Sequence, residues 1–411
     1  MFRLFSNYIN TFKGLSREVW WLALITLVNR TGAMVIPFLS LYLTEDKAFT
    51  VPQVGWVMSC FGLGSFFGAW LGGKLSDKIG YYKVILGSLF ATGIAFVLTQ
   101  YVSTFVGMCI AFFLLITVAD AARPAFFVAL SAYSKPKNKT RSLTLIRLAI
   151  NLGFSAGPAL GGLIIASIGY YGLFWVDGFT CIVAGLIMIQ TLNPKKAKIS
   201  DEEKVVKNPI APQKDMIYIL FLVAFALFGF IFVQYFSAMP LYYRQIFELS
   251  EKSIGLLLAM NGLLIVILEM PLIAFLEKTA LSNLQHVVVG LILTAISFIV
   301  LPLSPWVGIL IIGMLFMTVG EMIGLPMGNA FALQRSKKGR QGAYMGLFTM
   351  SFSVAHVFGH NVGMQLINNF GFNNTWLIMT GIGVVATILV LYAMRKLKYE
   401  KTTETVSLTK L

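Results

Sequence analysis

Residues 113–130, FLLITVADAARPAFFVAL, form an apolar run that carries only two charged residues, Asp120 and Arg123. With its apolar flanks, a helix of this run rises about 1.5 Å per residue and crosses a hydrocarbon layer of about 30 Å. A charged side chain at the centre of such a helix costs about 2.5–3.5 kcal/mol on insertion scales. The run therefore predicts a membrane helix whose two charges serve a purpose inside the bilayer.

The composition of the whole chain supports a membrane protein. Of its 411 residues, 57% are apolar and 12% are charged, whereas soluble domains have roughly 25% charged residues. Backbone groups in lipid need partners within their own segment, so we expect an all-α protein. Twelve apolar blocks are long enough to span a bilayer, at residues 20–44, 52–73, 83–101, 105–131, 142–167, 172–192, 216–240, 253–276, 286–303, 306–333, 343–367 and 374–394.

Basic residues predict the orientation of these spans. They are concentrated at both termini and in the even-numbered connections, whereas the odd-numbered connections hold only Lys47, Arg244 and Lys252. By the positive-inside rule both termini are cytoplasmic, in a bacterial-type cytoplasmic (inner) membrane. The net charge of +15 follows from this distribution, so membrane lipid is an expected partner and nucleic acid is not.

The chain also contains an internal repeat. The polar segment 193–215 separates an N-terminal bundle, residues 1–192, from a C-terminal bundle, residues 216–411. VADAARPAFFVAL in the first lines up with VGEMIGLPMGNAFAL in the second, so that Asp120 matches Glu321 and a basic loop follows each segment. A repeat of two pseudo-symmetric six-helix bundles is typical of secondary transporters, with substrate bound between the halves near the middle of the membrane.

A loop motif names a family. GGKLSDKIGYYK, residues 72–83, resembles the G-x-L-x-D-x-x-G signature of the major facilitator superfamily, which implies transport by alternating access. Glycines permit a tight turn close to a neighbouring helix, and the aspartate can meet a helix terminus or a cation in an inner gate. The matching residues are Gly73, Leu75, Asp77, Lys78, Gly80 and Lys83.

A second motif lies in the fifth span. GFSAGPALGG is similar to the antiporter motif of the twelve-helix drug/proton exchangers, which implies proton-coupled efflux. Glycines four residues apart leave one helix face bare for a close neighbour, and the proline bends the helix. Generic packing of small residues is the alternative explanation. The motif residues are Gly153, Gly157, Pro158, Gly161 and Gly162.

Ionisable residues inside the spans are functional candidates, because lipid tolerates them only where they line a shared polar cavity or pair with each other. Glu321 is the first choice for proton coupling, since it has no charged partner on its own helix and desolvation favours its protonated form. Asp120 and Glu269 are further proton-coupling candidates, with Arg30 and Arg123 as charge partners. The alternative for Asp120 and Arg123 is structural, because residues at i, i+3 can neutralise each other.

Two other charges within spans have simpler explanations. Arg147 lies within reach of a basic cytoplasmic loop, to which its side chain can extend. Asp177 lies near the outer end of its span, where a structural role is expected.

His356 and His360 lie one helical turn apart in the eleventh span. This is also a spacing of metal ligands, but two histidines do not complete a site, so no metal is expected. We expect the pair to line a polar cavity or relay protons. Further cavity-lining candidates in the seventh and eighth spans are Gln234, Tyr235 and Asn261.

These features predict a monomeric secondary transporter for small molecules, driven by protons and without a cofactor. The ATP-binding pattern G-x-x-x-x-G-K-[ST] is absent. A single charge moving down about 100 mV releases about 2.3 kcal/mol, enough for a roughly fifty-fold gradient of a neutral solute. Efflux of drug-like molecules is the first interpretation. Its rivals are an uptake symporter for a peptide, sugar or organic anion, with Arg30 and Arg123 as an anion clamp, and a membrane-embedded enzyme or sensor.

Overall fold

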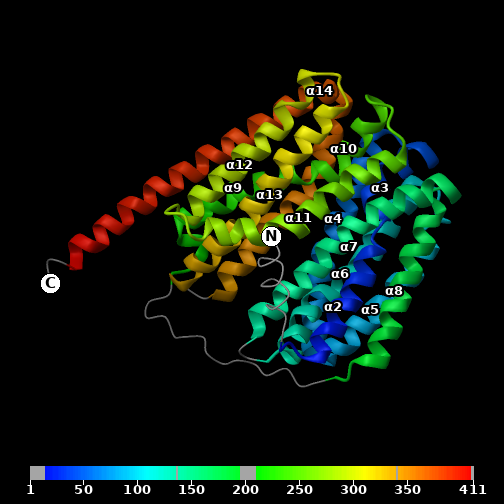
Figure 1. Ribbon diagram of the computed structural model, residues 1–411, viewed down its shortest axis with the longest axis horizontal. Helices are drawn as coiled ribbons and strands as arrows, with labels where there is room; N and C mark the ends of the chain where they lie inside the picture. The colour runs from blue at the N-terminus through cyan, green and yellow to red at the C-terminus, as the bar shows by residue number, and fades with distance from the viewer. Residues whose placement is uncertain (1–13, 136–137, 195–209, 339–340, 409–411) are drawn as a thin grey trace. The chain divides into compact units, whose positions relative to one another are not determined.

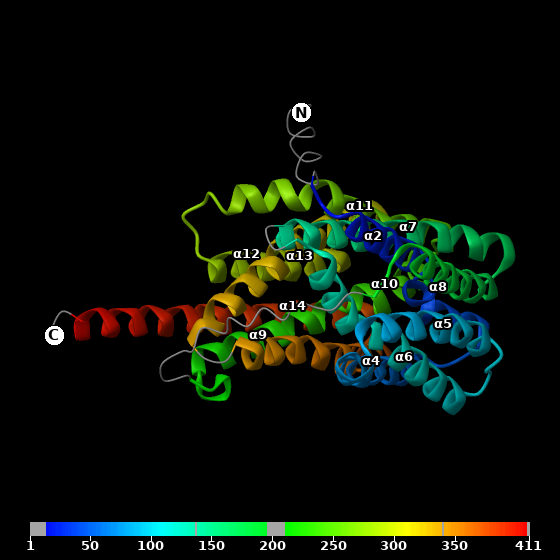
Figure 2. The same ribbon diagram turned by 90° about the horizontal axis from the view of Figure 1, so that it is seen from below.

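The computed structural model describes residues 14–135, 138–194, 210–338 and 341–408, and every regular element in these ranges is helical. The predicted all-α architecture is confirmed. Most of the predicted connecting segment 193–215 lies outside the described residues. The α-helices (Figures 1 and 2) are α2 (Arg17–Thr31), α3 (Val35–Leu41), α4 (Val51–Ile79), α5 (Tyr81–Thr99), α6 (Phe105–Tyr133), α7 (Lys139–Ile168), α8 (Tyr171–Thr191), α9 (Met216–Phe232), α10 (Gln234–Gln245), α11 (Glu251–Leu276), α12 (Asn283–Ile299), α13 (Gly308–Arg335) and α14 (Gln341–Leu408).

Among the described residues, 11 helical segments are long and apolar enough to cross a membrane. The last of them contains the eleventh and twelfth predicted spans, because α14 runs through a non-helical residue, Gly371, with φ 74° and ψ 174°. Only glycine adopts this backbone conformation without strain. The residue therefore separates two spans, in agreement with the twelve predicted.

The first predicted span, 20–44, is not one continuous helix. α2 ends at Thr31 and α3 begins at Val35. The carboxylate of Asp177 in α8 accepts hydrogen bonds from the backbone N–H groups of Met34, at 3.0 Å, and Val35, also at 3.0 Å. The Met34 N–H group also donates to the Gly32 carbonyl, whereas that of Val35 would otherwise lack a partner at the start of a helix. Asp177 thus stabilises the break, and its predicted structural role has a physical basis.

The seventh predicted span, 216–240, is interrupted in the same way, since α9 ends at Phe232 and α10 begins at Gln234. The two breaks form part of a repeat that extends to single backbone conformations. Ala48 and Glu248, which follow the first and seventh spans, are the two non-glycine residues with positive φ in the described chain, at 54° and 52°. The internal repeat seen in the sequence is therefore also present in the backbone.

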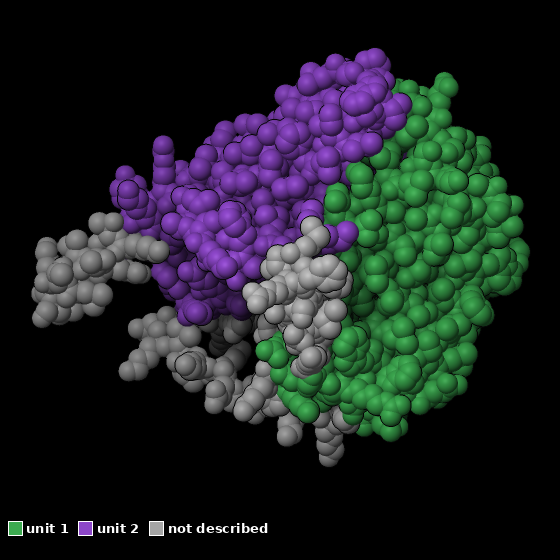
Figure 3. Space-filling model, viewed as in Figure 1, with its two compact units in different colours: residues 1–200, 243–266 green, residues 201–242, 267–411 purple. Residues whose placement is uncertain are grey.

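The described chain divides into two compact units (Figure 3). Unit 1 comprises residues 1–200 and 243–266, and unit 2 comprises residues 201–242 and 267–411. In unit 1, α4 and α5 pack on α6, α5 also packs on α8, and α2 packs on α7 and α8. In unit 2, α9 packs on α14, and α12 packs on both α13 and α14. The predicted bundle limits at 192 and 216 stay a prediction.

Candidate functional site

Arg30 lies in the last turn of α2, directly before the break in the first span. Carbonyl groups at a helix C-terminus carry partial negative charge, which favours a cation there. The Arg30 guanidinium carbon lies 5.6 Å from the ring centroid of Phe154 in α7. The Arg30 side chain makes no hydrogen bond and no ion pair with any described residue. Its five N–H donors are therefore available to a ligand.

Asp120 and Arg123 form an ion pair within α6. The Arg123 Nη2 atom lies 3.0 Å from each carboxylate oxygen of Asp120, and Ser65 of α4 also donates to that carboxylate. The side chain of Asp120 is 13% exposed, whereas that of Arg123 is 52% exposed. The geometry is thus the i, i+3 pairing considered for this helix, with the arginine reaching outward.

Arg30, Asp120 and Arg123 line one cavity of about 60 Å³ in unit 1. Its walls come from α2, α5 and α6. The Thr92 hydroxyl on its lining is buried and has no hydrogen-bond partner among the described residues. Two cations, one carboxylate and a free hydroxyl suit a small polar or anionic group. Other residues of the lining are Asn29, Ser88 and Phe126.

The candidates of the second half lie elsewhere. Glu321 in α13 is half-buried, and Glu269 in α11 is buried. Both belong to unit 2, whereas Arg30 and Arg123 belong to unit 1. Pairing of Glu321 with either arginine therefore stays a prediction.

The two histidines contact each other on α14, with ring centroids 5.5 Å apart. His360 is buried, and its Nδ1 atom has no hydrogen-bond partner among the described residues. His356 is half-buried and contacts the ring of Phe352. Three or more histidine, cysteine, aspartate or glutamate residues are nowhere grouped for a metal within the ranges that the structure describes. A proton relay through this pair stays a prediction.

Two of the remaining cavity candidates, Gln234 and Tyr235, donate to backbone carbonyl groups. The Gln234 amide donates to the carbonyl groups of Phe230, at 3.0 Å, and Gly359, at 2.8 Å. The Tyr235 hydroxyl donates to the carbonyl of Gly313 at 3.2 Å. Asn261 is half-buried on α11. A role of Gln234, Tyr235 or Asn261 in lining a substrate cavity stays a prediction.

The glycine motif of α7 packs against two partners. Along one edge, Gly153 meets Arg30, Gly157 meets the Thr31 carbonyl and Gly161 meets Met34, so this edge receives the broken first span. Along the other edge, Pro158 and Gly162 meet α11. The bare face is thus a packing surface, as four-residue spacing suggests. Its specific role in antiport stays a prediction.

The loop motif forms the turn between α4 and α5. Gly80 has φ 88° and ψ 145° and supplies the tight turn. The predicted close approach to a neighbouring helix is made by Gly72, which abuts the Ala121 carbonyl, and Gly73 has no neighbour there. Leu75 packs against the core of unit 1. The remaining motif residues, Asp77, Lys78 and Lys83, are exposed.

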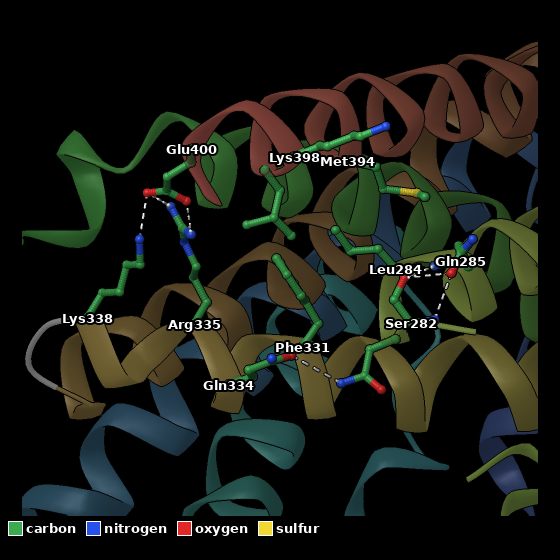
Figure 4. A pocket seen from close by; sticks show the side chains of 12 residues that line it. Ser282, Leu284, Gln285, Phe331, Gln334, Arg335, Lys338, Met394, Lys398 and Glu400 are labelled. Atoms are coloured by element: carbon green, nitrogen blue, oxygen red, sulfur yellow. Dashed lines mark hydrogen bonds and ion pairs between the residues drawn. The ribbon is translucent and has the colours of Figure 1, made fainter. Parts of the chain in front are cut away.

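Unit 2 contains a charge cluster that was not predicted from the sequence. Arg335 donates two hydrogen bonds to Asp215, of 2.6 and 2.7 Å, and two to Glu400, of 2.6 and 3.3 Å. Lys338 also donates to Glu400, at 2.6 Å. Figure 4 shows Glu400 between Lys338 and Arg335, at the edge of a cavity of about 460 Å³. These residues come from separate segments, so spacing in the sequence gave no signal.

Membrane-length helices that enclose paired charges define a multi-pass membrane transporter. The Major Facilitator Superfamily is the matching family, over residues 22–283 and 283–409, and the chain belongs to it. Its fold and relatives are those of transporters, so the interpretation as a membrane-embedded enzyme is wrong.

Some curated relatives match most of the chain, and others match about half of it. The chain is 25% identical over 404 residues to the uncharacterized MFS-type transporter YqjV of Bacillus subtilis, covering 93% of this chain and 95% of the relative. It is 20% identical over 406 residues to a Na(+), Li(+), K(+)/H(+) antiporter of Planococcus maritimus, covering 89% and 92%. The 4-hydroxybenzoate transporter PcaK of Pseudomonas aeruginosa is 28% identical over 197 residues, 46% of this chain and 44% of the relative.

Solved structures show the same fold. A POT family transporter in complex with 5-aminolevulinic acid superimposes with a TM-score of 0.77 at 14% identity, covering 93% of this chain and 97% of that chain. This likeness concerns the fold alone.

Proposed function

We propose that this chain is a proton-coupled secondary transporter of small organic molecules that works by alternating access in a bacterial-type inner membrane, with cytoplasmic termini and as a monomer. The observation that carries the proposal is the cavity in unit 1 that brings Arg30, Asp120 and Arg123 together. Charges at this depth in a spanning bundle are retained for function. A relative named as a cation/H(+) antiporter supports the coupling to protons.

The ion pair of α6 gives the coupling a mechanism. A proton on Asp120 removes its negative charge and weakens the bond to Arg123. Arg123, whose side chain is already half exposed, is then released toward the cavity. A proton therefore changes the charge that a substrate meets. If protonated and unprotonated states favour different facing conformations, their differential binding drives the cycle. Glu321, with Glu269, is the proposed second protonation site.

Efflux is the first candidate for direction, because of the antiporter-like motif in α7. Uptake of an organic anion together with protons is the second candidate, and the unused guanidinium of Arg30 favours it. A relative named as a 4-hydroxybenzoate transporter, over about half of this chain, supports an organic anion as the substrate. Transport into inside-out vesicles compared with right-side-out vesicles separates the two.

Proteoliposomes with an imposed pH gradient and a panel of labelled solutes test the proposal. Asp120→Asn and Glu321→Gln should each abolish the pH-driven component of transport. Exchange of the same solute, measured without a pH gradient, should be unchanged. Glu277→Gln is the matched control, because Glu277 is exposed at the end of α11. Coupling that survives both substitutions removes these residues from the mechanism, and no pH-driven movement of any solute overturns the proposed function.

A further inference from the structure

The cavity of unit 1 has donors without acceptors. The guanidinium of Arg30 lines it and makes no hydrogen bond or ion pair with any described residue. Thr92, a residue only 5% exposed, lines the same cavity, and its buried hydroxyl has no partner among those residues. An unpaired charge or hydroxyl away from water costs free energy that a suitable ligand recovers. Because Arg30 and Thr92 line the same cavity, we treat both groups as candidate donors to one ligand.

The charges of the lining select the sign of the ligand. Arg30 and Arg123 carry two positive charges, and Asp120 carries one negative charge. The excess of one positive charge repels cations and is neutralised by a monoanion. A guanidinium presents a fork of parallel N–H groups that matches the two oxygens of a carboxylate.

The size of the cavity limits what enters it. Its volume of about 60 Å³ has room for a few waters, since one water needs about 10–15 Å³ of cavity volume. A carboxylate group fits in this volume. The rest of the ligand must extend past Arg123, whose side chain is half exposed. Phe126 on the lining and Phe154 under Arg30 provide apolar surface beside the charge.

We propose that this cavity binds the carboxylate of a small organic monoanion, with Arg30 as the principal donor and the Thr92 hydroxyl as a second donor. Arg123 exchanges its bond to Asp120 for one to the ligand. This inference rests on the proposed function, because it names the substrate class of the same site.

Equilibrium binding to the purified full-length protein tests the proposal with acid and amide pairs: benzoate with benzamide, and acetate with acetamide. We expect a carboxylate to bind and its neutral amide to bind at least tenfold more weakly. Arg30→Gln should weaken binding of the acid at least tenfold. Arg30→Lys, which keeps the charge and loses the fork, should weaken it less, and Thr92→Val should weaken it a few-fold.

Arg147→Gln is the matched control, since Arg147 belongs to α7 and does not line the cavity. Thermal unfolding of each variant shows that it is folded, and Thr92→Val provides a test that leaves every charge in place. The proposal is overturned if no acid binds better than its amide, or if Arg30→Gln binds the acid as the wild type does.

The two proposals fail in different ways. Transport of neutral or cationic solutes along a pH gradient, without carboxylate binding, contradicts the ligand class and leaves proton-coupled transport standing. Carboxylate binding that depends on Arg30, without transport along any pH gradient, supports the ligand class and contradicts the proposed coupling.

Discussion

The Nε atom of Arg244 lies 2.7 Å from a carboxylate oxygen of Glu45, although the two residues are 199 positions apart in the sequence. The other Glu45 oxygen accepts a hydrogen bond of 2.8 Å from the hydroxyl of Tyr170. Arg244 also lies 3.2 Å from Glu251. This charge cluster connects the end of the first span with the beginning of α11, within unit 1.

The cluster of Glu45, Arg244 and Glu251 lies beside a close helix contact. We term this contact the α7–α11 seam; it is formed by residues 155–162 of α7 and 251–262 of α11. The Ser155 hydroxyl donates to the Ala259 carbonyl at 2.9 Å. Gly162 and Gly255 let the two backbones touch. The seam joins the first half of the sequence to the second, so opening it is a step that alternating access would require.

Glu45→Gln is predicted to loosen the seam. The Glu45 and Arg244 side chains are about a third exposed, so the pair is worth about 0.2–1 kcal/mol, or up to about a five-fold change in population. The readout is the labelling rate of Ser155→Cys, a buried position, with Cys60, Cys109 and Cys181 replaced by alanine. In a double-mutant cycle, Glu45→Gln and Arg244→Gln together should have a smaller effect than the sum of their separate effects, because each breaks the same pair. Asp46→Asn is the control, because Asp46 pairs with its neighbour Lys47. Strict additivity of the two changes would contradict coupling.

Gly255→Ala is predicted to open the seam further. An added methyl group would overlap the backbone carbonyl oxygen of Pro158, which cannot rotate away as a side chain could. Overpacking of this kind costs about 1–3 kcal/mol, so labelling of Ser155→Cys should rise at least several-fold. Gly87→Ala in α5 adds the same methyl where no atom lies within 4 Å, and it should leave labelling unchanged. Equal effects of the two substitutions would show that the seam is not close-packed.

Local patterns explain why much of the architecture could be predicted. Hydropathy locates each span because a membrane helix satisfies its backbone within itself. The Asp120–Arg123 pair follows from i, i+3 spacing on one helix. The contact of Arg244 with Glu45 joins distant segments, and nothing in either neighbourhood specifies the partner.

The break in the first span also depends on contacts from distant segments, which local sequence does not specify. Gly32 is a weak signal alone, and the stabilising groups, the Asp177 carboxylate and the Thr180 side chain that packs on Gly32, come from α8. The sequence places Arg30 within the predicted first span. It could not show that the Arg30 side chain lacks a partner among the described residues, because that depends on three helices meeting around one cavity.

Asp177→Ala is predicted to destabilise unit 1. The substitution removes the acceptor of the buried Val35 N–H group and one acceptor of the Met34 N–H group, which keeps the Gly32 carbonyl. Loss of a helix cap costs about 0.5–2 kcal/mol. Asp177→Asn keeps one acceptor oxygen and should cost less. The unfolding temperatures of the purified proteins should fall in the order wild type, Asp177→Asn, Asp177→Ala. An Asp177→Ala protein as stable as the wild type would show that the break does not depend on this carboxylate.

Asp215→Asn is predicted to destabilise unit 2 in a pH-dependent manner. Burial alone would raise the pKa of Asp215, but the hydrogen bonds and charge of Arg335 outweigh it and hold the pKa below its ordinary value. The side chains of Asp215 and Arg335 are 2% and 6% exposed, and loss of one member of a buried pair costs about 3–5 kcal/mol. Because Arg335 keeps its hydrogen bond to Glu400, we expect the lower end of this range, about 3 kcal/mol.

The sign of the pH dependence follows from the lowered pKa. A carboxylate with a lowered pKa in the folded state contributes its full stability above the ordinary aspartate pKa of about 3.9 and loses it as the pH falls through the folded-state value. The difference in unfolding temperature between wild type and Asp215→Asn should therefore be constant from pH 7 to about 5 and shrink below about 4. Glu277→Gln, at an exposed carboxylate, should give no such difference at any pH. A difference that grows on acidification would mean that Asp215 is held protonated, contrary to its geometry with Arg335.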